Sequence, residues 1–365
     1  MKSHASDRVR LLIMSVGSLV GTNVLECLEA LGRDRFELTG LNSEAESANN
    51  FRMDVCYLSP RASDRAELLF LLDRVVHAHA PHLIIPTRDD DVVVLSQWAQ
   101  GRPNARAMVG SPTFAEIIRD KWASFQWANE RQLPFARSAI DPLGAARLRQ
   151  ELGLPLIAKP RDGFGSNGVR MLVTEDHLRA VLAAGNYIVQ ECLDPPRVLT
   201  AEDLRLGMPF WFAPVQVANP STLCLLHESG YEYLAAWVSD ARCGAALRTV
   251  LIDAPPLRQL AMDFAETAWR EGWRGLLNVQ TRVDSAGRYI PIELAGRFIG
   301  STAALQALGV PVAAAVLRRF VPSFDLGATM HPAMHAAALK QVVTYSVRPE
   351  WRRALEQRGI WRAPG

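Results

Sequence analysis

The stretch YIPIELAGRFIGST, Tyr289–Thr302, carries a carboxylate at Glu293 and a guanidinium at Arg297 beside small residues, at the end of an apolar run. Packing alone would favour an apolar side chain at such a strand end, so the two charges need another explanation. A guanidinium can stabilise the charge that develops on a phosphoryl group during its transfer. A surface ion pair on an ordinary hairpin is the alternative explanation.

The preceding segment, GLLNVQTRVDSAGR, adds further oxygen atoms. Side chains two residues apart on a strand point to the same side, so Asn278 and Gln280 share one face. A turn at residues 285–287 folds the second arm back on the first and brings Glu293 near the level of Gln280. An amide oxygen and a carboxylate at a strand pair are suitable ligands for Mg²⁺ when phosphate oxygens complete its octahedron. The hairpin is therefore a candidate metal site.

A glycine-rich loop, RDGFGSNG, joins the strand-like segments LPLIAKP and VRMLVT. Its glycines let the backbone adopt positive φ and turn N–H groups toward an anion. Ser166 adds a hydroxyl donor and Lys159 a cation at the base of the loop, as expected of a flap over a polyphosphate. An ordinary hairpin with a glycine-rich turn is the alternative, and the spacing excludes a Walker loop.

Two further segments gain interest from their position. Lys121, in IIRDKWASF, lies just ahead of the glycine-rich loop, although a lone lysine on a helix is usually a solvated surface residue. In YIVQECLD, Tyr187, Val189 and Glu191 alternate along one side of a strand. Where such a strand continues as a linker, its backbone groups can read the edge of a purine. A core strand is the alternative.

These residues are carried by regions of different pattern. Residues 1–110 alternate strands and helices in the segments VRLLIMSVG, TNVLECLEALG, FELTGLN, RAELLFLLDRVVHAHA, PHLIIPT and DDDVVVLSQWAQ. Continuous apolar strands of this kind are covered on both faces, so we expect a doubly wound α/β domain. Residues 111–186 predict one helix over SPTFAEIIRDKWASFQWANERQL, the two strands around the loop, and a helix over EDHLRAVLAAG. Residues 187–325 are strand-rich and contain one long helix, PPLRQLAMDFAETAWREG, and residues 326–365 form a tail that we expect to pack on the core.

Composition narrows the class of protein. The 365 residues allow two or three domains, and 49% hydrophobic with 21% charged residues is the balance of a soluble globular protein. A net charge of +2 gives no reason to expect a nucleic-acid or membrane partner, and no apolar run approaches the ~20 residues that span a bilayer. The N-terminus lacks the apolar segment of a secretory signal, and five cysteines without paired spacing indicate reduced thiols rather than a zinc site. We therefore expect a cytoplasmic protein.

In this order, the segments resemble the ATP-grasp superfamily over most of the chain. The resemblance implies an N-terminal Rossmann-like parallel-sheet domain, followed by a two-part ATP-grasp fold with antiparallel sheets. Residues 1–110 would be the pre-ATP-grasp domain, 111–186 the small subdomain with the flap, and 187–325 the large subdomain with the metal-binding hairpin. The implied ligands are ATP and one or two Mg²⁺ ions, with Mn²⁺ as an alternative ion.

The resemblance also implies roles for single residues. RDKWASF matches the first ATP lysine at Lys121, and PLIAKPRDGFGSNGV matches the second lysine and the flap, through Lys159, Gly163, Gly165, Ser166 and Gly168. YIVQECL is similar to the adenine-binding linker, which implies base contacts from Glu191, Cys192 and Leu193. SDARCGAA resembles a segment with a phosphate-contacting arginine, here Arg242. The hairpin resembles the metal-binding one, with Gln280 and Glu293 as ligands and Arg297 at the phosphoryl site.

One position departs from the pattern of the family. ATP-grasp proteins usually have asparagine two residues after the hairpin glutamate, where this chain has Ala295. An alanine cannot bind Mg²⁺, so a second ion would be held by phosphates and water or less firmly. Some ATP-grasp amino-acid ligases carry a similar small residue there.

The resemblance implies an ATP-dependent carboxylate–amine ligase that forms an amide bond through an acylphosphate on a small acid or amino acid. Its partners would be a small-molecule carboxylate and an amine or other nucleophile, and a homodimer is an open alternative to a monomer. A carboxylate kinase that releases the phosphorylated acid, and a nucleotide-binding protein without chemistry, are the alternatives. A nicotinamide-dependent oxidoreductase is disfavoured, because SVGSLVGTN lacks the G-x-G-x-x-G spacing.

Overall fold

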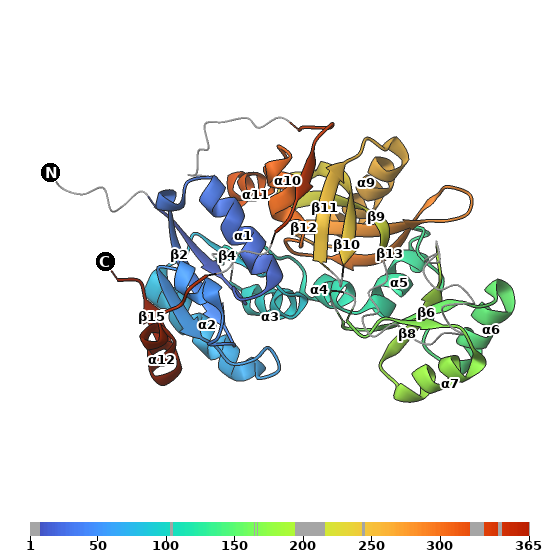
Figure 1. Cartoon of the computed structure of the whole chain (residues 1–365), viewed down its shortest axis with the longest axis horizontal. Coiled ribbons are helices and arrows are strands. Elements are labelled where there is room, and N and C mark those ends of the chain that lie inside the picture. The colour runs from blue at the N-terminus through green and yellow to red at the C-terminus, as the bar shows by residue number, and fades with distance from the viewer. Residues whose placement is uncertain are drawn as a thin grey trace.

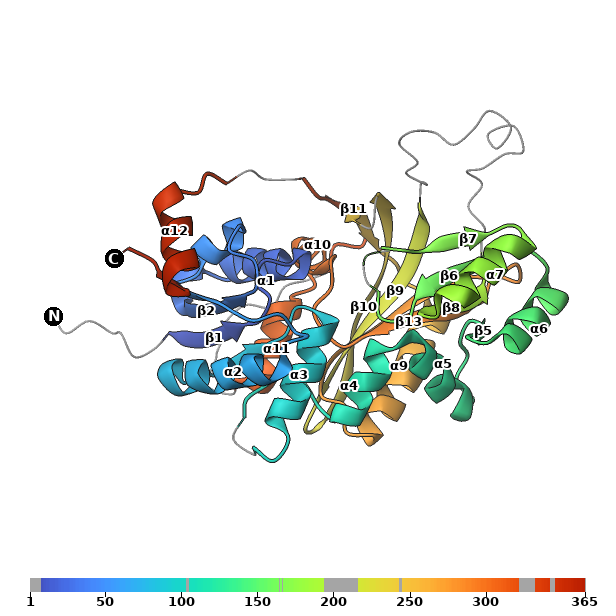
Figure 2. The ribbon, with the colours of Figure 1, turned by 90° about the horizontal axis from the view of Figure 1, so that it is seen from below.

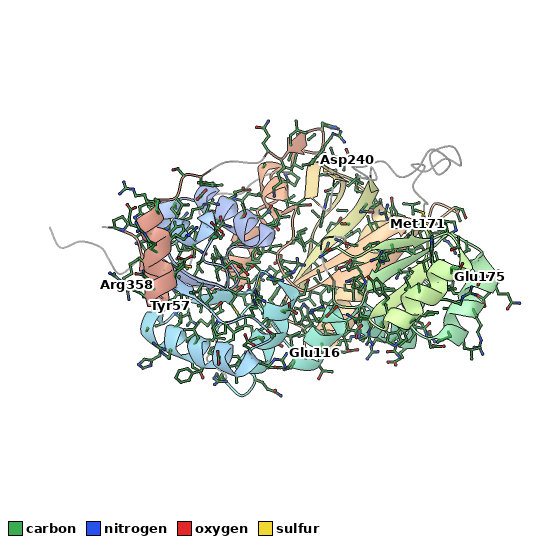
Figure 3. All side chains as sticks on the ribbon, turned by 60° about the horizontal axis from the view of Figure 1, so that its bottom comes forward. Tyr57, Glu116, Met171, Glu175, Asp240 and Arg358 are labelled. Carbon is green, nitrogen blue, oxygen red and sulfur yellow. The ribbon has the colours of Figure 1, made fainter. Side chains whose placement is uncertain are left out.

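Three β-sheets follow one another along the molecule. The structure is a computed structural model that describes residues 8–102, 105–163, 165, 167–193, 216–242, 245–321, 332–341 and 345–364. In Figure 1 the blue N-terminal sheet lies at one end, the yellow and orange sheet in the middle and the green sheet at the other end. With all side chains drawn, Tyr57 and Arg358 lie at one end of the molecule and Met171 and Glu175 at the other (Figure 3).

The N-terminal sheet has the strand order β15-β3-β2-β1-β4. The four strands β1 (Val9–Ile13), β2 (Phe36–Asn42), β3 (Val55–Leu58) and β4 (Leu83–Ile85) pair in parallel, and β15 (Ile360–Arg362) pairs antiparallel with β3. Around it lie the helices α1 (Leu19–Ala30), α2 (Arg65–His79), α3 (Asp89–Ala99) and α12 (Pro349–Arg358), with the 3₁₀ turns η1 (Arg33–Arg35) and η2 (Ala48–Arg52). The predicted doubly wound α/β domain is confirmed.

The central sheet has the order β13-β12-β9-β10-β11-β14, with every neighbouring pair antiparallel. Its strands are β9 (Gln216–His227), β10 (Gly230–Arg242), β11 (Ala245–Leu251), β12 (Gly275–Val283), β13 (Tyr289–Ala295) and β14 (Ala337–Leu339). Alternate residues of β12 face opposite sides, so that Leu277 and Val279 share a hydrophobic cluster with α9 (Pro255–Arg270). Leu276 joins the cluster of α1 and α11 (Val312–Phe320) on the other side, near α10 (Thr302–Ala307).

The flap sheet has the order β5-β8-β6-β7 and carries the glycine-rich loop between β6 and β7. Its strands are β5 (Ser138–Ala139), β6 (Leu156–Pro160), β7 (Arg170–Leu172) and β8 (Tyr187–Glu191), and the helices α6 (Pro142–Leu152) and α7 (Glu175–Ala184) complete its own small core. In Figure 2 this unit stands apart from the N-terminal sheet, with α4 (Pro112–Arg119) and α5 (Lys121–Glu130) between them.

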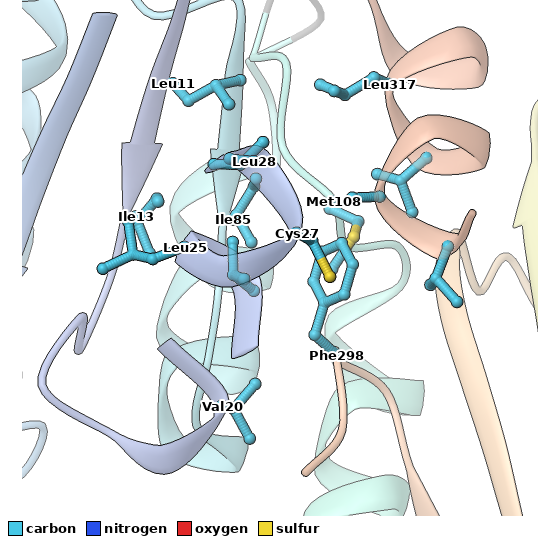
Figure 4. Close-up of a cluster of buried hydrophobic side chains, with 14 of the residues drawn as sticks. Leu11, Ile13, Val20, Leu25, Cys27, Leu28, Ile85, Met108, Phe298 and Leu317 are labelled. Atoms are coloured by element: carbon cyan, nitrogen blue, oxygen red, sulfur yellow. The ribbon is translucent and has the colours of Figure 1, made fainter. Parts of the chain in front are cut away.

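The N-terminal sheet and the central sheet share one hydrophobic core. Phe298 and Met108 lie beside Cys27 in this cluster, and Leu317 of α11 lies farther along it (Figure 4). Phe298 is 1% exposed. Because Phe298 follows Arg297 directly, its burial fixes the backbone that carries the predicted catalytic arginine.

The helix predicted over residues 111–133 is wrong, because the structure breaks it at Asp120. That residue has extended backbone, and its carboxylate accepts from the backbone N–H of Trp122 and pairs with Arg161. Aspartate is a good N-cap, so a new helix begins at Lys121. The chain also contains β3, β5, β11, β14, β15, α6, α10 and α11, which the sequence pattern did not predict.

Of the described cysteines, Cys27, Cys56 and Cys224 are buried free thiols. Within the described ranges, no helix has both the length and the apolar composition needed to cross a bilayer.

Candidate functional site

A cleft of about 350 Å³ lies where the N-terminal unit, the central sheet and the glycine-rich loop meet. The N-terminal unit contributes the start of α1 and the residues around the start of α3. Gly165 comes from the loop, and the central sheet provides the floor. Four of the residues predicted from the sequence line this one cleft, namely Gly165, Gln280, Glu293 and Arg297. The structure therefore brings together the flap loop and the predicted metal hairpin.

The floor of the cleft is a row of cross-strand pairs. Gln280 of β12 pairs with Glu293 of β13 on one side and with Ser221 of β9 on the other. One step along, Asn278 pairs with Ala295. Neighbouring Cβ atoms in such pairs are about 4.5–5.5 Å apart, so the oxygens of Gln280 and Glu293 can reach one ion. The predicted position of Glu293 opposite Gln280 in the strand pair is confirmed.

Lys121 joins the flap loop to the hairpin. Its Nζ donates to the Gly163 carbonyl oxygen at 2.5 Å and lies 3.5 Å from Glu293 Oε1. Only 8% of the residue is exposed, although it is the first residue of α5. The position of this lysine is thus set by the Asp120 cap that starts the helix, and a surface lysine is excluded.

Lys159, near the end of β6, is buried beside the same carboxylate. Its Nζ donates to Gln190 Oε1 at 2.7 Å on the neighbouring strand β8. Burial lowers the pKa of Lys159 to about 8, partly opposed by the attraction of Glu293. A buried cation of this kind gains free energy when an anionic ligand enters its surroundings.

Two glycines of the flap loop have conformations that other residues rarely adopt. Gly165 has φ +60° and Gly168 has φ +73°, both in the left-handed region. A Cβ on Gly168 would lie 2.8 Å from Pro160 Cγ, so the loop can turn back to β7 only with glycine there. Ser166 lies outside the described residues.

Arg297 is held by an ion pair to the N-terminal unit. Its Nη2 donates to Asp89 Oδ2 at 2.7 Å and its Nη1 to the Phe298 carbonyl oxygen at 3.0 Å. Burial disfavours the charged Asp89, but the Arg297 charge and hydrogen bond outweigh burial and hold the pKa of Asp89 below its ordinary value. Gly296 lies so close to Trp273 that an added Cβ would be 2.6 Å from the ring, which explains the small residue beside the charge.

Asp91 fixes the loop in front of α3 that forms one wall of the cleft. It accepts from the Ser15 hydroxyl at 2.8 Å and from the backbone N–H groups of Thr87 and Arg88 at 3.2 and 2.9 Å. Burial raises the pKa of Asp91 to about 6, in spite of these donors. In the sequence, Asp91 belongs to three consecutive aspartates at the start of the predicted helix DDDVVVLSQWAQ. The general preference of acidic residues for a helix N-terminus does not predict that Asp89 and Asp91 bind different partners.

The segment predicted to bind adenine lies at the end of β8. The Glu191 carboxylate accepts from the backbone N–H of Arg137 at 2.8 Å and pairs with the Arg137 guanidinium at 3.2 Å. Cys192 and Leu193 follow as partly exposed residues just after the strand. Base contacts from these residues stay a prediction, and the side chain of Arg242 lies outside the described part of the structure.

The oxygen atoms of the floor suit a hard divalent cation. Among the described residues, no three His, Cys, Asp or Glu side chains gather as a metal cluster. Glu293 and the amide of Gln280 nevertheless face one space, and Asn278 adds a buried amide oxygen without a hydrogen-bond partner among the described residues. A site with one carboxylate and neutral amide oxygens suits an Mg²⁺ ion that binds together with phosphate oxygens. The residues present therefore fit this ion.

No protein-family model matches the chain, and no curated protein matches its sequence. Solved structures do match its fold. The biotin carboxylase domain of 2-oxoglutarate carboxylase from Hydrogenobacter thermophilus, in complex with MgADP, ADP and bicarbonate, is 15% identical, with a TM-score of 0.63 over 85% of this chain and 69% of the other.

An N5-carboxyaminoimidazole synthetase from Staphylococcus aureus, complexed with ADP, is 11% identical, with a TM-score of 0.64 over 89% of this chain and 80% of the other. An L-amino acid ligase from Bacillus licheniformis is 14% identical, with a TM-score of 0.62 over 90% and 78%. With its parallel N-terminal sheet, flap sheet and central antiparallel sheet, the chain has the ATP-grasp fold.

Proposed function

We propose that this protein is an ATP-dependent carboxylate–amine ligase that acts on a small acid or amino acid. The observation that carries the proposal is the single cleft in which Gly165 of the flap loop faces Gln280, Glu293 and Arg297. An anion-binding loop, oxygen ligands for a cation and a guanidinium are the groups that phosphoryl transfer needs. Structures of the same fold with ADP and MgADP support a nucleotide in this place.

The nucleotide phosphates would lie between the flap loop and the hairpin. Lys121 and Lys159 are both buried near Glu293, and the pKa of Lys159, lowered to about 8, still leaves most of its charge at neutral pH. Backbone N–H groups of the glycine-rich loop would cover the phosphates and exclude water. Glu191, Cys192 and Leu193 would contact the base, and Arg242 would be a further phosphate contact.

The chemistry follows from these positions in two steps. A carboxylate oxygen of the acid attacks the γ-phosphorus, a new O–P bond forms, and the bond to the β-phosphate oxygen breaks to release ADP. The amine then attacks the acyl carbon, inorganic phosphate leaves, and the amine loses a proton. Arg297 lies where its guanidinium would stabilise charge on the transferring group. Gln280 and Glu293 would hold Mg²⁺, which supplies charge neutralisation on the phosphates when bound.

A phosphate-release screen tests the proposal. Purified protein with ATP and Mg²⁺ is offered the common amino acids and small acids singly and in pairs, and ADP, phosphate and products are measured. We expect phosphate release that requires one acid and one amine. Release of a phosphorylated acid without an amine would instead identify a carboxylate kinase, and nucleotide binding without turnover on any pair would contradict the ligase.

Arg297→Ala tests the role of the guanidinium. Loss of one charge-stabilising donor typically lowers kcat about 10²–10³-fold, so we expect that loss with ADP affinity changed far less. Arg270→Ala is the matched control, because that arginine is exposed on α9. Unchanged turnover in Arg297→Ala would reject the assigned role, and thermal melts of both variants separate misfolding from loss of chemistry.

A further inference from the structure

Asn278 has a buried oxygen that no described residue uses. The residue is 1% exposed and lines the cleft, and its Oδ1 has no hydrogen-bond partner among the described residues. Its Nδ2 donates to the Thr222 carbonyl oxygen at 2.7 Å. A carbonyl only accepts, so the amide nitrogen must face Thr222, and the oxygen is fixed on the other side. A buried polar atom without a partner costs free energy, which a ligand can recover.

The register places this oxygen beside the other two oxygens of the hairpin. Asn278 and Gln280 lie two residues apart on one face of β12, and they pair with Ala295 and Glu293 of β13. These four residues form a rectangle on the floor of the cleft, and three of its corners carry side-chain oxygens. The fourth corner, Ala295, leaves open space next to Asn278. Asn278 thus lies directly opposite Ala295, the position at which the asparagine of the family pattern is absent.

The cationic groups close to this rectangle make their hydrogen bonds elsewhere, Lys159 to Gln190 among them, and the buried Arg297 Nε has no partner among the described residues. Lys121 Nζ lies 3.5 Å from Glu293 and donates to Gly163, and Arg297 bonds to Asp89 and Phe298. The free acceptor of Asn278 therefore points to an additional positive ligand. A carboxylate with two neutral amide oxygens is a donor set for a hard divalent cation, which binds few protein oxygens when phosphates complete its shell.

We propose that Asn278 Oδ1 is a third protein ligand of the divalent cation and replaces the ligand that Ala295 lacks. This inference rests on the proposed function, because the cation arrives with a nucleotide. The three protein ligands together carry a single negative charge, from Glu293. The cation therefore binds tightly only when the nucleotide phosphates supply further negative oxygens.

Mn²⁺ binding in the presence of ADP tests the inference without turnover. Free Mn²⁺ is measured by electron paramagnetic resonance during titration of wild type and variants. Wild type should bind Mn²⁺ with ADP and much more weakly without it. Asn278→Ala should weaken the ADP-dependent binding roughly tenfold or more, since even the loss of residues outside the ligand shell costs 10–100-fold at metal sites.

Two further variants separate ligation from a general effect on the fold. The double variant Asn278→Ala/Ala295→Asn still lacks the hydrogen bond to Thr222, but it has an asparagine at the opposite position of the strand pair. Mn²⁺ affinity should therefore recover, while thermal stability stays low. Asn219→Ala removes another unpartnered amide oxygen that lines the cleft, and Mn²⁺ affinity should stay at the wild-type value.

The failure of this inference differs from the failure of the proposed function. If Glu293→Gln abolishes Mn²⁺ binding while Asn278→Ala leaves it unchanged, the ligand role of Asn278 is overturned and the nucleotide site stands. The role is also overturned if the double variant stays as weak as Asn278→Ala, because the weaker binding would then follow from the lost bond to Thr222 and not from a lost ligand. If wild type binds neither ADP nor ADP-dependent Mn²⁺, the proposed function itself fails.

Discussion

The ion pair between Asp89 and Arg297 joins the N-terminal unit to the hairpin, and Asp89→Asn should break it. The two charged groups are 2.7 Å apart, and their side chains are only 18% and 14% exposed. Removal of one partner from a buried pair costs about 3–5 kcal/mol, because the other charge remains without compensation. Both side chains keep some contact with solvent, so we expect a loss of about 3 kcal/mol, at the lower end of that range.

Thermal unfolding followed by circular dichroism measures this loss. With about 2.1 cal/mol/K per residue, the 365 residues have an unfolding entropy of roughly 0.8 kcal/mol/K, so the midpoint should fall by about 4 °C. Asp176→Asn is the matched control, since Asp176 makes the same kind of pair with Arg179 but the side chains are 82% and 72% exposed. An exposed pair contributes about 0.2–1 kcal/mol, so its midpoint should shift by about 1 °C at most.

The pH dependence of the difference between wild type and Asp89→Asn has a definite sign. Arg297 holds the pKa of Asp89 below its ordinary value, against the effect of burial. The pair therefore contributes its full stabilisation at pH values above the ordinary pKa of an aspartate. This contribution is lost as the pH falls through the lowered pKa of Asp89. The stability difference should be constant near neutral pH and shrink in acid.

A double-mutant cycle can refute this reasoning. Asp89→Asn/Arg297→Gln removes both charges, so its loss should be clearly smaller than the sum of the two single losses. If the losses add, or if Asp89→Asn melts within about 1 °C of wild type, the pair is not the buried link between the two units that the geometry indicates.

Two other predictions concern residues beside the cleft. ADP affinity should fall as the pH rises through about 8, where buried Lys159 loses its charge, by up to about tenfold per pH unit, and Lys159→Met should bind more weakly and show a flat profile in calorimetric titrations. A slope that persists in Lys159→Met would assign the titration to another group. Gly296→Ala should lower the unfolding free energy by about 1–3 kcal/mol, because its Cβ would lie 2.6 Å from the Trp273 ring. Gly300→Ala, whose Cβ would meet only Leu19 at 3.7 Å, should melt close to wild type, and equal midpoints for both would contradict the packing argument.

The strands of the hairpin and the position of Glu293 opposite Gln280 could be predicted because they depend on local pattern. Side chains alternate along a strand, and a tight turn fixes the register of its two arms. The structure bears this out for β12 and β13. The parallel strands β1, β2 and β4 of the N-terminal sheet were equally visible as apolar runs, since both faces of this sheet are covered, whereas the short strand β3 was not.

The features that the sequence did not reveal depend on contacts between distant segments. The break at Asp120 combines a local N-cap with an ion pair to the distant Arg161, and the helical periodicity runs smoothly across it. The link from Asp89 to Arg297 exists only because the N-terminal unit docks on the central sheet, which no local pattern encodes. The burial of Lys121 and Lys159 likewise follows from the placement of the flap sheet, so their electrostatic surroundings became visible only in three dimensions.

Strand β15 gives the N-terminal sheet an unusual dependence on the order of protein synthesis. Ile360–Arg362 pairs with β3, so this edge of the sheet is covered only after a segment far later in the chain has been made. Until then β3 presents unpaired N–H and carbonyl groups, which can pair with a strand of another nascent chain. This late segment therefore affects the yield of folded protein as well as its stability, since intermediates without it leave the β3 edge open to misassembly.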